Sequence, residues 1–245
     1  MQLSELFYSL QGEGITRGTP SVFLRFNGCN LTCGVQSNVC DATKASWICD
    51  SYKIWQQKNI ELTNEQLLEK LLNWGSREDY NNERIHLVWT GGEPLIEKNA
   101  NQIYSFLTFA RDKGFFFFSE VETNGTQFSK QLFDEGLINL VNCSPKLSNS
   151  GIYKDVRCNE VILKQLSCIK NTYFKFVITS KDQWYEIEND FSMVSPSRII
   201  LMPGMDCLNE TNTKVMQSIW ELAREKKVLF STREHIHVWN KLTGV

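Results

Sequence analysis

Short apolar runs rich in branched and aromatic residues alternate with longer amphipathic stretches along most of this chain. Runs of about four to eight such residues are typical of buried β-strands. The pattern predicts strands at 21–26, 85–89, 115–122, 138–143, 173–179 and 198–202, with a further short strand at 227–231.

The stretches between these runs have the spacing of amphipathic helices. They predict helices at 64–74, about 99–112, 127–135, 158–169, 181–192 and 210–226. The first begins with a capping box formed by Thr63 and Gln66. Alternating helices and nearly continuous apolar strands indicate a parallel sheet covered by helices. Because no repeat, linker or low-complexity tract is present, we expect one α/β domain over 1–245.

Composition limits the class of protein. Hydrophobic residues make up 42% of the 245 positions and charged residues 22%, which excludes a disordered chain. The net charge of -2 and the pI of about 6.0 provide no broad basic surface, so no nucleic-acid partner is expected. No apolar run approaches the roughly twenty residues of a membrane span, and the N-terminus lacks a secretory pattern. We therefore expect a cytoplasmic protein without a membrane partner.

The segment from 29 to 51 carries more closely spaced thiols than a soluble fold needs. Three residues separate Cys29 from Cys33, and Cys49 follows within WICDS. Three thiolates on one loop suit three irons of a four-iron, four-sulfur cluster and leave the fourth iron open to a small chelating ligand. A structural zinc site is the serious alternative, although no second tight cysteine pair and no nearby histidine is present. Disulfides are not expected in a protein without an export signal.

The remaining cysteines outside this loop have an ordinary interpretation. Cysteine is one of the most frequently buried residue types and behaves as a small hydrophobe. We therefore predict buried core positions for Cys143, Cys158, Cys168 and Cys207.

Polar or chain-breaking motifs follow five of the predicted strands. Ligands of parallel α/β folds gather at the carboxyl ends of the strands, so these motifs predict one shared site. The motifs are Cys29, TGGEP (90–94), ETNG (122–125), SPK (144–146) and the Met-Pro pair at 202–203.

Two of these motifs also have simpler explanations. The glycines of TGGEP allow backbone to approach a ligand without a Cβ in the way, but a Gly-Gly pair occurs equally well in a turn. ETNG is typical of a turn too, whereas Glu122 and Asn124 offer the acceptor and donor that a ribose or an amine needs. Their position at one edge of the sheet favours a binding role.

The cysteine loop, TGGEP and ETNG together resemble the radical S-adenosylmethionine superfamily. More narrowly, the chain is similar to the 7-carboxy-7-deazaguanine synthase family from residue 7 to its last residue. The matching motifs are FYSLQGEG (7–14), FLRFNGCNLTC (23–33), CDS (49–51), TGGEP, VETNGT (121–126), SPK, KFVIT (175–179) and the tail HIHVWNKLTGV. The resemblance implies a partial (β/α) barrel of about six parallel strands.

The cluster loop departs from the usual pattern. The superfamily commonly has two residues between the second and third cluster cysteines, whereas fifteen separate Cys33 from Cys49. We interpret 34–48 as an inserted segment. Cys40 competes for the third ligand position, but only Cys49 has a hydrophobic residue before it and an Asp and a hydroxyl after it. That hydroxyl belongs to Ser51, where the family more often has threonine.

The resemblance assigns roles to the matching positions. Cys29, Cys33 and Cys49 would hold the cluster, and Ser51 would bind magnesium. The residues implied for S-adenosylmethionine are Ile48, Gly92, Glu93, Glu122, Asn124, Ser144, Pro145, Lys146, Met202 and Pro203. The residues implied for the substrate are Gln11, Gly12, Glu13, Arg25, Thr90, His235 and Val245.

For several of the substrate positions, the side chain indicates how it would contact the substrate. Gln11 and Glu13 would read the guanidine-like edge of a pterin, or else form a polar turn. Arg25 would pair with the substrate carboxylate, with a surface ion pair as the alternative. His235 would bind the substrate by a hydrogen bond unless it is an ordinary histidine, and Val245 would bind it through the terminal carboxylate unless the terminus is frayed.

The implied enzyme is a carbon–nitrogen lyase that converts 6-carboxy-5,6,7,8-tetrahydropterin to 7-carboxy-7-deazaguanine with loss of ammonia, in 7-deazapurine biosynthesis of the queuosine type. The implied cofactors are a 4Fe-4S cluster, S-adenosylmethionine and Mg²⁺. Because the reactive species comes from the cofactor, no catalytic side chain is expected. An external electron donor of the flavodoxin or ferredoxin type and a homodimer are also implied. Alternatives are another short radical enzyme, such as a glycyl-radical activase, and a non-enzymatic zinc-binding module.

Overall fold

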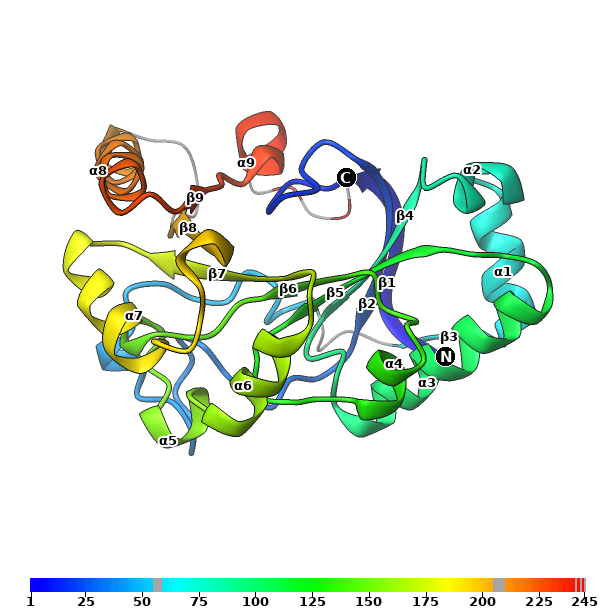
Figure 1. The fold of residues 1–245 in the computed structure, drawn as a ribbon, viewed down its shortest axis with the longest axis horizontal. Helices are drawn as coiled ribbons and strands as arrows, with labels where there is room; N and C mark the ends of the chain where they lie inside the picture. Colours follow the sequence, from blue (N-terminus) through cyan, green and yellow to red (C-terminus); the bar gives the residue numbers. More distant parts are fainter. Residues whose placement is uncertain (55–58, 205–209, 241, 243, 245) are drawn as a thin grey trace.

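The computed structural model describes residues 1–54, 59–204, 210–240, 242 and 244. Its strands form one sheet in the order β3-β1-β2-β4-β5-β6-β7-β8-β9 (Figure 1). The strands are β1 Gln2–Leu10, β2 Pro20–Phe26, β3 Ile60–Glu61, β4 His86–Gly91, β5 Phe118–Thr123, β6 Leu140–Cys143, β7 Thr172–Ile178, β8 Ile199–Pro203 and β9 Leu229–Phe230. From β2 through β4 to β9 every neighbouring pair is parallel, whereas β1 and β3 are antiparallel additions. The sheet is open between β3 and β9, as in the predicted partial barrel.

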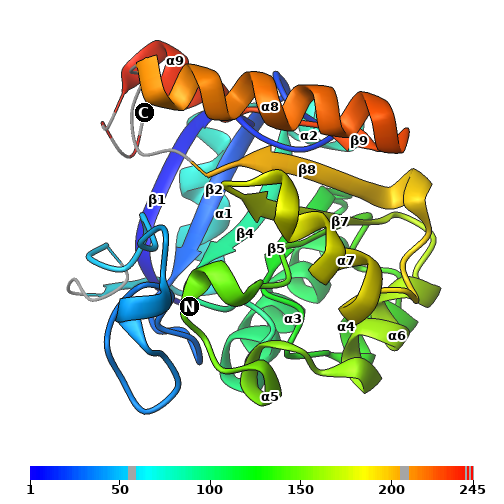
Figure 2. The same cartoon turned by 90° about the vertical axis from the view of Figure 1, so that its left-hand side faces the viewer.

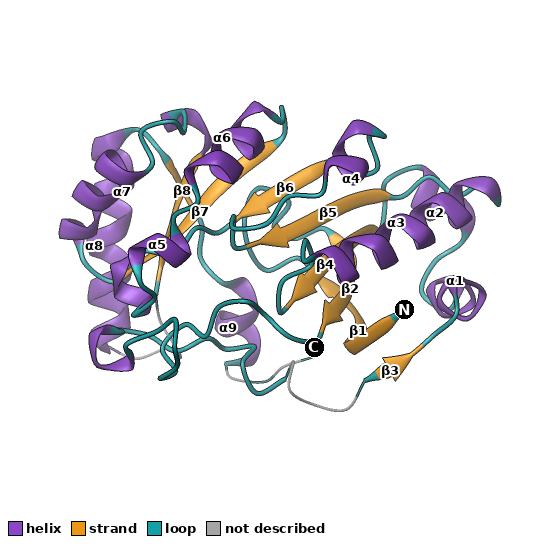
Figure 3. Ribbon diagram, turned by 90° about the horizontal axis from the view of Figure 1, so that it is seen from below, coloured by secondary structure: helices purple, strands orange, loops and turns teal. Residues whose placement is uncertain are grey.

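The helices connect the parallel strands and cover one side of the sheet. They are α1 Asn64–Leu72, α2 Arg77–Asn81, α3 Glu97–Asp112, α4 Lys130–Asp134, α5 Lys154–Arg157, α6 Glu160–Cys168, α7 Trp184–Asp190, α8 Glu210–Lys226 and α9 Glu234–Trp239. Short 3-10 turns lie at Ala42–Lys44, Ser148–Ser150, Lys181–Gln183 and Pro196–Arg198. Figure 2 shows α8 lying along β8, and Figure 3 shows α1 to α8 in an arc around the strands, with α9 on the other side.

The two faces of the parallel strands differ in chemistry because successive side chains point to opposite faces. The face toward α3, α4 and α6 belongs to the main hydrophobic core and includes Leu24, Trp89, Val121, Phe174 and Leu201. The opposite face carries polar or charged side chains from five strands, namely Arg25, Thr90, Glu122, Asn142 and Lys175. A polar inner face beside an apolar outer face is what places the site inside the curve of the sheet.

The strand β1 is the longest element that the sequence pattern missed. It pairs with β2, and its register shifts between Leu3 and Glu5. Such an irregularity breaks the alternation by which a half-buried strand is recognised in a sequence.

The predicted strand at 115–122 is wrong at its first residues, because β5 begins at Phe118. Phe116 is 60% exposed. Phe117 meets the Tyr80 ring edge-to-face at a centroid distance of 5.0 Å and stacks on Phe106 at 5.9 Å, so it packs between helices and does not extend the sheet.

The cysteines outside the loop follow the prediction only in part. Cys143 is buried on β6, Cys158 is half-buried, and Cys168 is exposed at the end of α6. The expectation for Cys168 was wrong because the last turn of a surface helix leaves one side open to water. Cys207 lies outside the described residues. Among the helices that the structure describes, none is long and apolar enough to cross a membrane.

The capping box at the start of α1 is present and generates a stability prediction. The Thr63 hydroxyl accepts the Gln66 N–H at 3.2 Å, and the Gln66 side chain accepts the Thr63 N–H at 2.9 Å. Replacing Thr63 with Ala leaves one helix N–H without its partner, so we expect the free energy of unfolding to fall by about 1 kcal/mol. Urea denaturation measures this change. Thr63→Ser keeps the oxygen and is the control; equal midpoints for the Ala and Ser variants would contradict the assignment.

Candidate functional site

The three predicted cluster cysteines border one small apolar group of residues beyond the end of β2. Cys33 is 5% exposed and packs with Leu31 and Ile152, while Cys29 and Cys49 are half-buried at the edge of this group. The Cys49 N–H donates to the Cys33 carbonyl oxygen at 3.1 Å. This backbone contact brings the third cysteine beside the second despite the residues inserted between them.

The environment of these thiols favours their neutral form while no metal is bound. Burial raises the pKa of both Cys29 and Cys33 to about 12, and Lys146 opposes the shift at each. Two N–H groups point to the Cys29 sulfur, from Leu31 at 3.4 Å and from the Asn124 side chain at 3.6 Å. Metal binding takes thiols as thiolates, so iron would supply the positive charge that releases their protons.

The hollow beside Cys29 has a volume of about 250 Å³ and is lined largely by amide side chains. Those amides are Gln2, Asn27, Asn30, Asn59 and Asn99. Within the described ranges, no three His, Cys, Asp or Glu side chains come close enough together to hold a single metal ion. The three thiols are instead arranged around a shared apolar surface.

The segment 34–48, which we interpreted as an insertion, is hydrogen-bonded to the segment 149–153. Backbone hydrogen bonds of 2.8–2.9 Å join Gly34 to Ser150, Asp41 to Gly151 and Ser46 to Asn149. Cys40 is fully buried in this contact, where its thiol donates to the Ser150 carbonyl oxygen at 3.6 Å. Cys40 thus has a packing role inside the insertion.

The TGGEP loop lies directly against the cluster loop. The Gly92 N–H donates to the Phe26 carbonyl oxygen at 3.0 Å, and the Glu93 N–H donates to that of Gly28 at 2.9 Å. A Cβ added to Gly92 would overlap the Gly28 carbonyl oxygen. Glycine is therefore required here by the close approach of two backbones, as expected from its lack of a side chain.

The Glu93 carboxylate ties the TGGEP loop to the ETNG turn. It is fully buried and accepts hydrogen bonds from the Thr123 hydroxyl at 2.7 Å, the Asn124 N–H at 2.7 Å and the Leu95 N–H at 3.0 Å. Burial raises the pKa of Glu93, although these hydrogen bonds favour its charged form. The Ser144 N–H also donates to the Thr123 carbonyl oxygen at 2.7 Å, which joins SPK to the same turn.

The other residues implied for S-adenosylmethionine lie at the same edge of the sheet. The Lys146 ammonium donates to the Ser144 hydroxyl at 3.1 Å and lies 5.8 Å from the centre of the Trp47 ring. Pro145 is buried beside them, and Met202 and Pro203 are buried at the end of β8. Ile48 differs, because its side chain is 62% exposed next to Cys49.

A chain of hydrogen bonds crosses the inner face of the sheet from β4 to β7. Glu122 accepts the Thr90 hydroxyl at 2.6 Å and the Gln11 amide at 3.3 Å. The Gln11 side-chain oxygen accepts the Glu13 N–H at 3.2 Å, and the Glu13 carboxylate forms an ion pair with Lys175. Four residues predicted for cofactor or substrate are thus joined, through the loop 11–19, in one connected network.

The ion pair at the end of this network is buried. The Lys175 and Glu13 side chains are 7% and 17% exposed. Burial opposes both charges, but Lys175, Arg233 and His235 outweigh it and lower the pKa of Glu13, while Glu13 and Glu122 raise the pKa of Lys175. Both groups are therefore charged at neutral pH. The stability that Glu13 contributes is lost only as the pH falls through its lowered pKa.

Arg25 and Ser51 lie side by side. The Arg25 guanidinium donates to the Glu5 carboxylate and to the Ser51 hydroxyl, both at 2.8 Å. The Ser51 hydroxyl donates to Asp50 at 3.1 Å, and Asp50 pairs with Arg233 at 3.3 Å. The predicted magnesium ligand and the predicted partner of the substrate carboxylate are therefore in direct contact.

The segment around α9 closes over the QGEG loop. The Glu234 N–H donates to the Gly12 carbonyl oxygen at 2.9 Å. A Cβ on Gly12 would lie 2.5 Å from Nδ1 of His235, so only glycine fits below this ring. Val245 lies outside the described residues, and its predicted contact with the substrate remains a prediction.

The sequence interpretation gave no role to Lys175, Arg233 or Asp50, which all contribute charges to the site. A detectable signal existed for Lys175, because it is a single charged residue within the apolar run YFKFVIT, and β2 and β5 carry comparable charges. No comparable signal marks Arg233, because it lies in a polar segment whose position depends on the fold.

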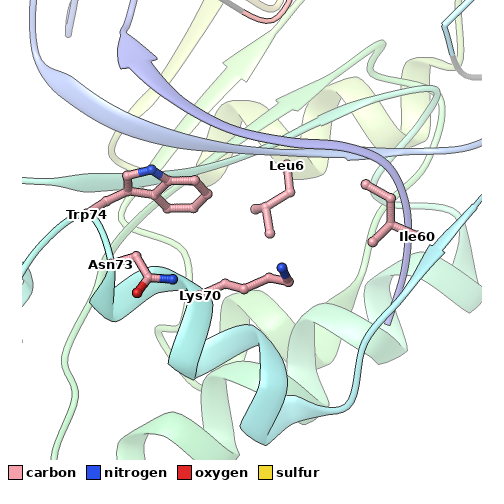
Figure 4. A pocket seen from close by; sticks show the side chains of 5 residues that line it. All are labelled: Leu6, Ile60, Lys70, Asn73 and Trp74. Atoms are coloured by element: carbon pink, nitrogen blue, oxygen red, sulfur yellow. The ribbon is translucent and has the colours of Figure 1, made fainter.

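A second hollow, of about 170 Å³, lies on the outer surface beside α1 and β1 (Figure 4). It is lined by Leu6, Ile60, Lys70, Asn73 and Trp74. None of the residues that we predicted for the site lines this hollow, so it is separate from the inner face of the sheet.

Comparison with solved structures supports the architecture. The crystal structure of QueE from Escherichia coli has a TM-score of 0.61 and 20% sequence identity, covering 96% of this chain and 94% of that chain. Native anSMEcpe with bound AdoMet has a TM-score of 0.52 and 14% identity, covering 87% of this chain and 63% of that one. At these identities the likeness concerns the fold alone, and it confirms the predicted α/β class.

Sequence comparison identifies the relatives of the chain. No protein-family model matches it. A 7-carboxy-7-deazaguanine synthase of Halobacterium salinarum is 28% identical, covering 98% of this chain and 91% of the relative. A synthase of the same name from Rhodopirellula baltica is 32% identical over 82% of this chain and 72% of the relative. With this identity over most of both sequences, the chain belongs to the 7-carboxy-7-deazaguanine synthase family.

Proposed function

We propose that this chain converts 6-carboxy-5,6,7,8-tetrahydropterin to 7-carboxy-7-deazaguanine with loss of ammonia, as a radical S-adenosylmethionine lyase of 7-deazapurine biosynthesis. Membership of the synthase family supports the reaction. The observation that carries the proposal is the network from Thr90 to Lys175, because it presents fixed donors and acceptors on the inner face of the sheet. The Asn124 side chain links that face to the sulfur of Cys29.

The donor set fits the implied cluster. Cys29, Cys33 and Cys49 offer three thiols to three irons, and N–H groups near the Cys29 sulfur are of the kind that stabilise bound thiolates. With S-adenosylmethionine bound, such a cluster supplies a 5′-deoxyadenosyl radical that removes a hydrogen atom from the substrate. The chain's own part is to hold the reactants in position and to exclude water and oxygen.

The residues at the rim are proposed to hold S-adenosylmethionine. The backbone at Gly92 packs against the cluster loop without a Cβ between them, and Asn124, Ser144 and Lys146 present polar groups at the same edge. The Glu93 carboxylate is not proposed to bind S-adenosylmethionine directly, because its oxygens accept hydrogen bonds from the ETNG turn. Glu93 is proposed to contribute to cofactor binding through its backbone and by fixing the position of Asn124.

The residues below the rim are proposed to hold the substrate. Gln11 and Glu13 present acceptors for the amino and ring N–H groups of a pterin. Thr90 is connected to Gln11 because both donate a hydrogen bond to Glu122. Arg25 is proposed to pair with the substrate carboxylate, and Ser51 would offer an oxygen to Mg²⁺, which would supply positive charge for that carboxylate. Magnesium prefers oxygen ligands, and Ser51 offers one oxygen beside the Asp50 carboxylate.

Family membership excludes the two alternatives left open by the sequence. A glycyl-radical activase would have no use for the QGEG network or for the Arg25–Ser51 pair, and a zinc-binding module would need neither.

We further propose that 1–245 is one domain with 34–48 as an insertion in its cluster loop. An external flavodoxin- or ferredoxin-type electron donor and a homodimer are proposed on the basis of family resemblance.

The proposed reaction is tested by anaerobic reconstitution of the whole chain with iron and sulfide. The enzyme is then supplied with reductant, S-adenosylmethionine, Mg²⁺ and the tetrahydropterin, and the products are measured by mass spectrometry. We expect 7-carboxy-7-deazaguanine and ammonia in equal amounts. Cleavage of S-adenosylmethionine without consumption of the pterin would contradict the proposed substrate.

The assignment of the third cluster ligand predicts different outcomes for two cysteine variants. Cys49→Ser should lose most of the bound iron and the visible absorption of the cluster, because the third thiolate is absent. Cys40→Ser keeps a hydrogen-bond donor to Ser150 and should retain about the full iron content. Iron and sulfide analysis after reconstitution measures both, and the reverse result would assign the cluster to Cys40.

The role of Ser51 predicts a change in magnesium dependence. Ser51→Ala removes the oxygen offered to Mg²⁺ but no cluster ligand, so we expect weaker stimulation of turnover by magnesium with unchanged iron content. Ser51→Thr restores the hydroxyl and should restore the stimulation. Turnover is measured across a magnesium titration, and equal stimulation of wild type and the Ala variant would contradict this role.

A further inference from the structure

Lys175 is a buried cation for which the proposed chemistry of the cluster has no use. It lies on the inner face of β7 and is 6% exposed. Removing an ammonium from water is costly, and a well-packed apolar side chain at such a position is commonly as stable or more so. Stability alone therefore does not account for a lysine here, and its contacts indicate what it does.

The neighbours of Lys175 are acidic and come from three different segments. Glu13 in the loop between β1 and β2 forms the direct ion pair, and the carboxylates of Glu122 and Asp50 also favour the charge of Lys175. Glu122 is already engaged by the Thr90 hydroxyl and the Gln11 amide. The ammonium thus lies beside Glu13, which we propose to contact the substrate, and near Glu122, which joins Gln11 and Thr90 of the same site.

An ammonium carries three N–H donors, and the contact with Glu13 uses one of them. A carboxylate has two oxygens, each with more than one acceptor position. Glu13 and Lys175 together therefore present two acceptors followed by one donor along a single edge. A 2-amino-4-oxo pyrimidine ring presents the complementary order, with an amino group and a ring N–H as donors followed by a carbonyl oxygen as acceptor.

We propose that Lys175 donates a hydrogen bond to the ring 4-carbonyl oxygen of the pteridine whose amino and N–H groups bind Glu13. This assignment rests on the proposed function, because it takes a pterin as the substrate. Lys175 is then the residue that determines specificity for the oxo group. A 4-thioxo ring keeps both N–H donors for Glu13 but offers the ammonium a sulfur, which is a weak acceptor, and buried sites built for a hydrogen bond reject such analogues strongly.

The ion pair could also serve only to fix Glu13, and the two roles predict different behaviour. If Lys175 only positions Glu13, its loss weakens the binding of the oxo and thioxo rings by the same factor, because both rings offer Glu13 the same two N–H donors. If Lys175 contacts the carbonyl oxygen, its loss weakens the oxo ring alone and reduces the discrimination between the two rings. The ratio of the two dissociation constants therefore separates the two roles.

The test uses two rings that do not react, 6-carboxypterin and its 4-thioxo counterpart. Each is titrated into the reconstituted full chain with S-adenosylmethionine at pH 8, and binding is measured by calorimetry. The wild type should bind 6-carboxypterin more tightly by a factor on the order of a hundred. Lys175→Met should reduce this factor to about ten or less. Lys164→Met removes an exposed lysine that pairs with Glu160 at 2.9 Å on α6, and it should leave the ratio unchanged.

Two results of these titrations would overturn the assignment of Lys175. A folded Lys175→Met variant that keeps the wild-type ratio would overturn the assignment, and so would a wild type that binds both rings equally. The second result needs no variant, so the proposal stays testable if Lys175→Met unfolds because Glu13 has lost its partner. If the wild type binds neither ring and does not convert the tetrahydropterin, the proposed function itself is wrong. If it converts the tetrahydropterin but binds the two rings equally, only the assignment of Lys175 is wrong.

Discussion

The buried ion pair between Glu13 and Lys175 holds the two ends of the inner face together. Lys175 belongs to β7, whereas Glu13 belongs to the loop that follows the antiparallel strand β1. Charges on the inner face of a sheet need partners, because an isolated buried charge is expensive. The loop 11–19 supplies those partners by entering the curve of the sheet, and its insertion also brings Gln11 to Glu122.

The rim above this face depends on a second set of constraints, which act mainly through the backbone. Gly92 allows the TGGEP loop to touch the backbone before Cys29, and the Glu93 carboxylate joins that loop to the ETNG turn. The two contacts place the cysteine loop, β4 and β5 in one fixed arrangement. Both contacts are made by the protein's own groups, so residues of the chain itself set the shape of the rim.

The insertion in the cluster loop is compatible with this arrangement because it is held from outside. Its backbone hydrogen bonds go to the segment 149–153, which follows SPK, and Cys40 is packed in that contact. Meanwhile the Cys49 N–H returns to the Cys33 carbonyl oxygen. The length of the insertion therefore does not set the distance between the second and third cysteines; the backbone contact at its base does.

The sequence by itself determined where most of the parallel strands and helices lie along the chain, and which motifs follow the strands. Local patterns suffice for these features, because apolar runs, capping residues such as Thr63 and glycines before helices act over a few residues. The resemblance of the motifs also led to the family, which the relatives confirm.

Only the tertiary structure decided which charges face one another. Lys175 and Glu13 are far apart in the chain, as are Arg233 and Asp50, and no local pattern states that they meet. The irregular register of β1 concealed that strand from the sequence pattern, yet β1 carries Glu5 to Arg25 and leads into the loop with Gln11 and Glu13. Electrostatic partners across a sheet depend on the path of the whole chain, which is why the sequence indicated the rim of the site but not the charged network beneath it.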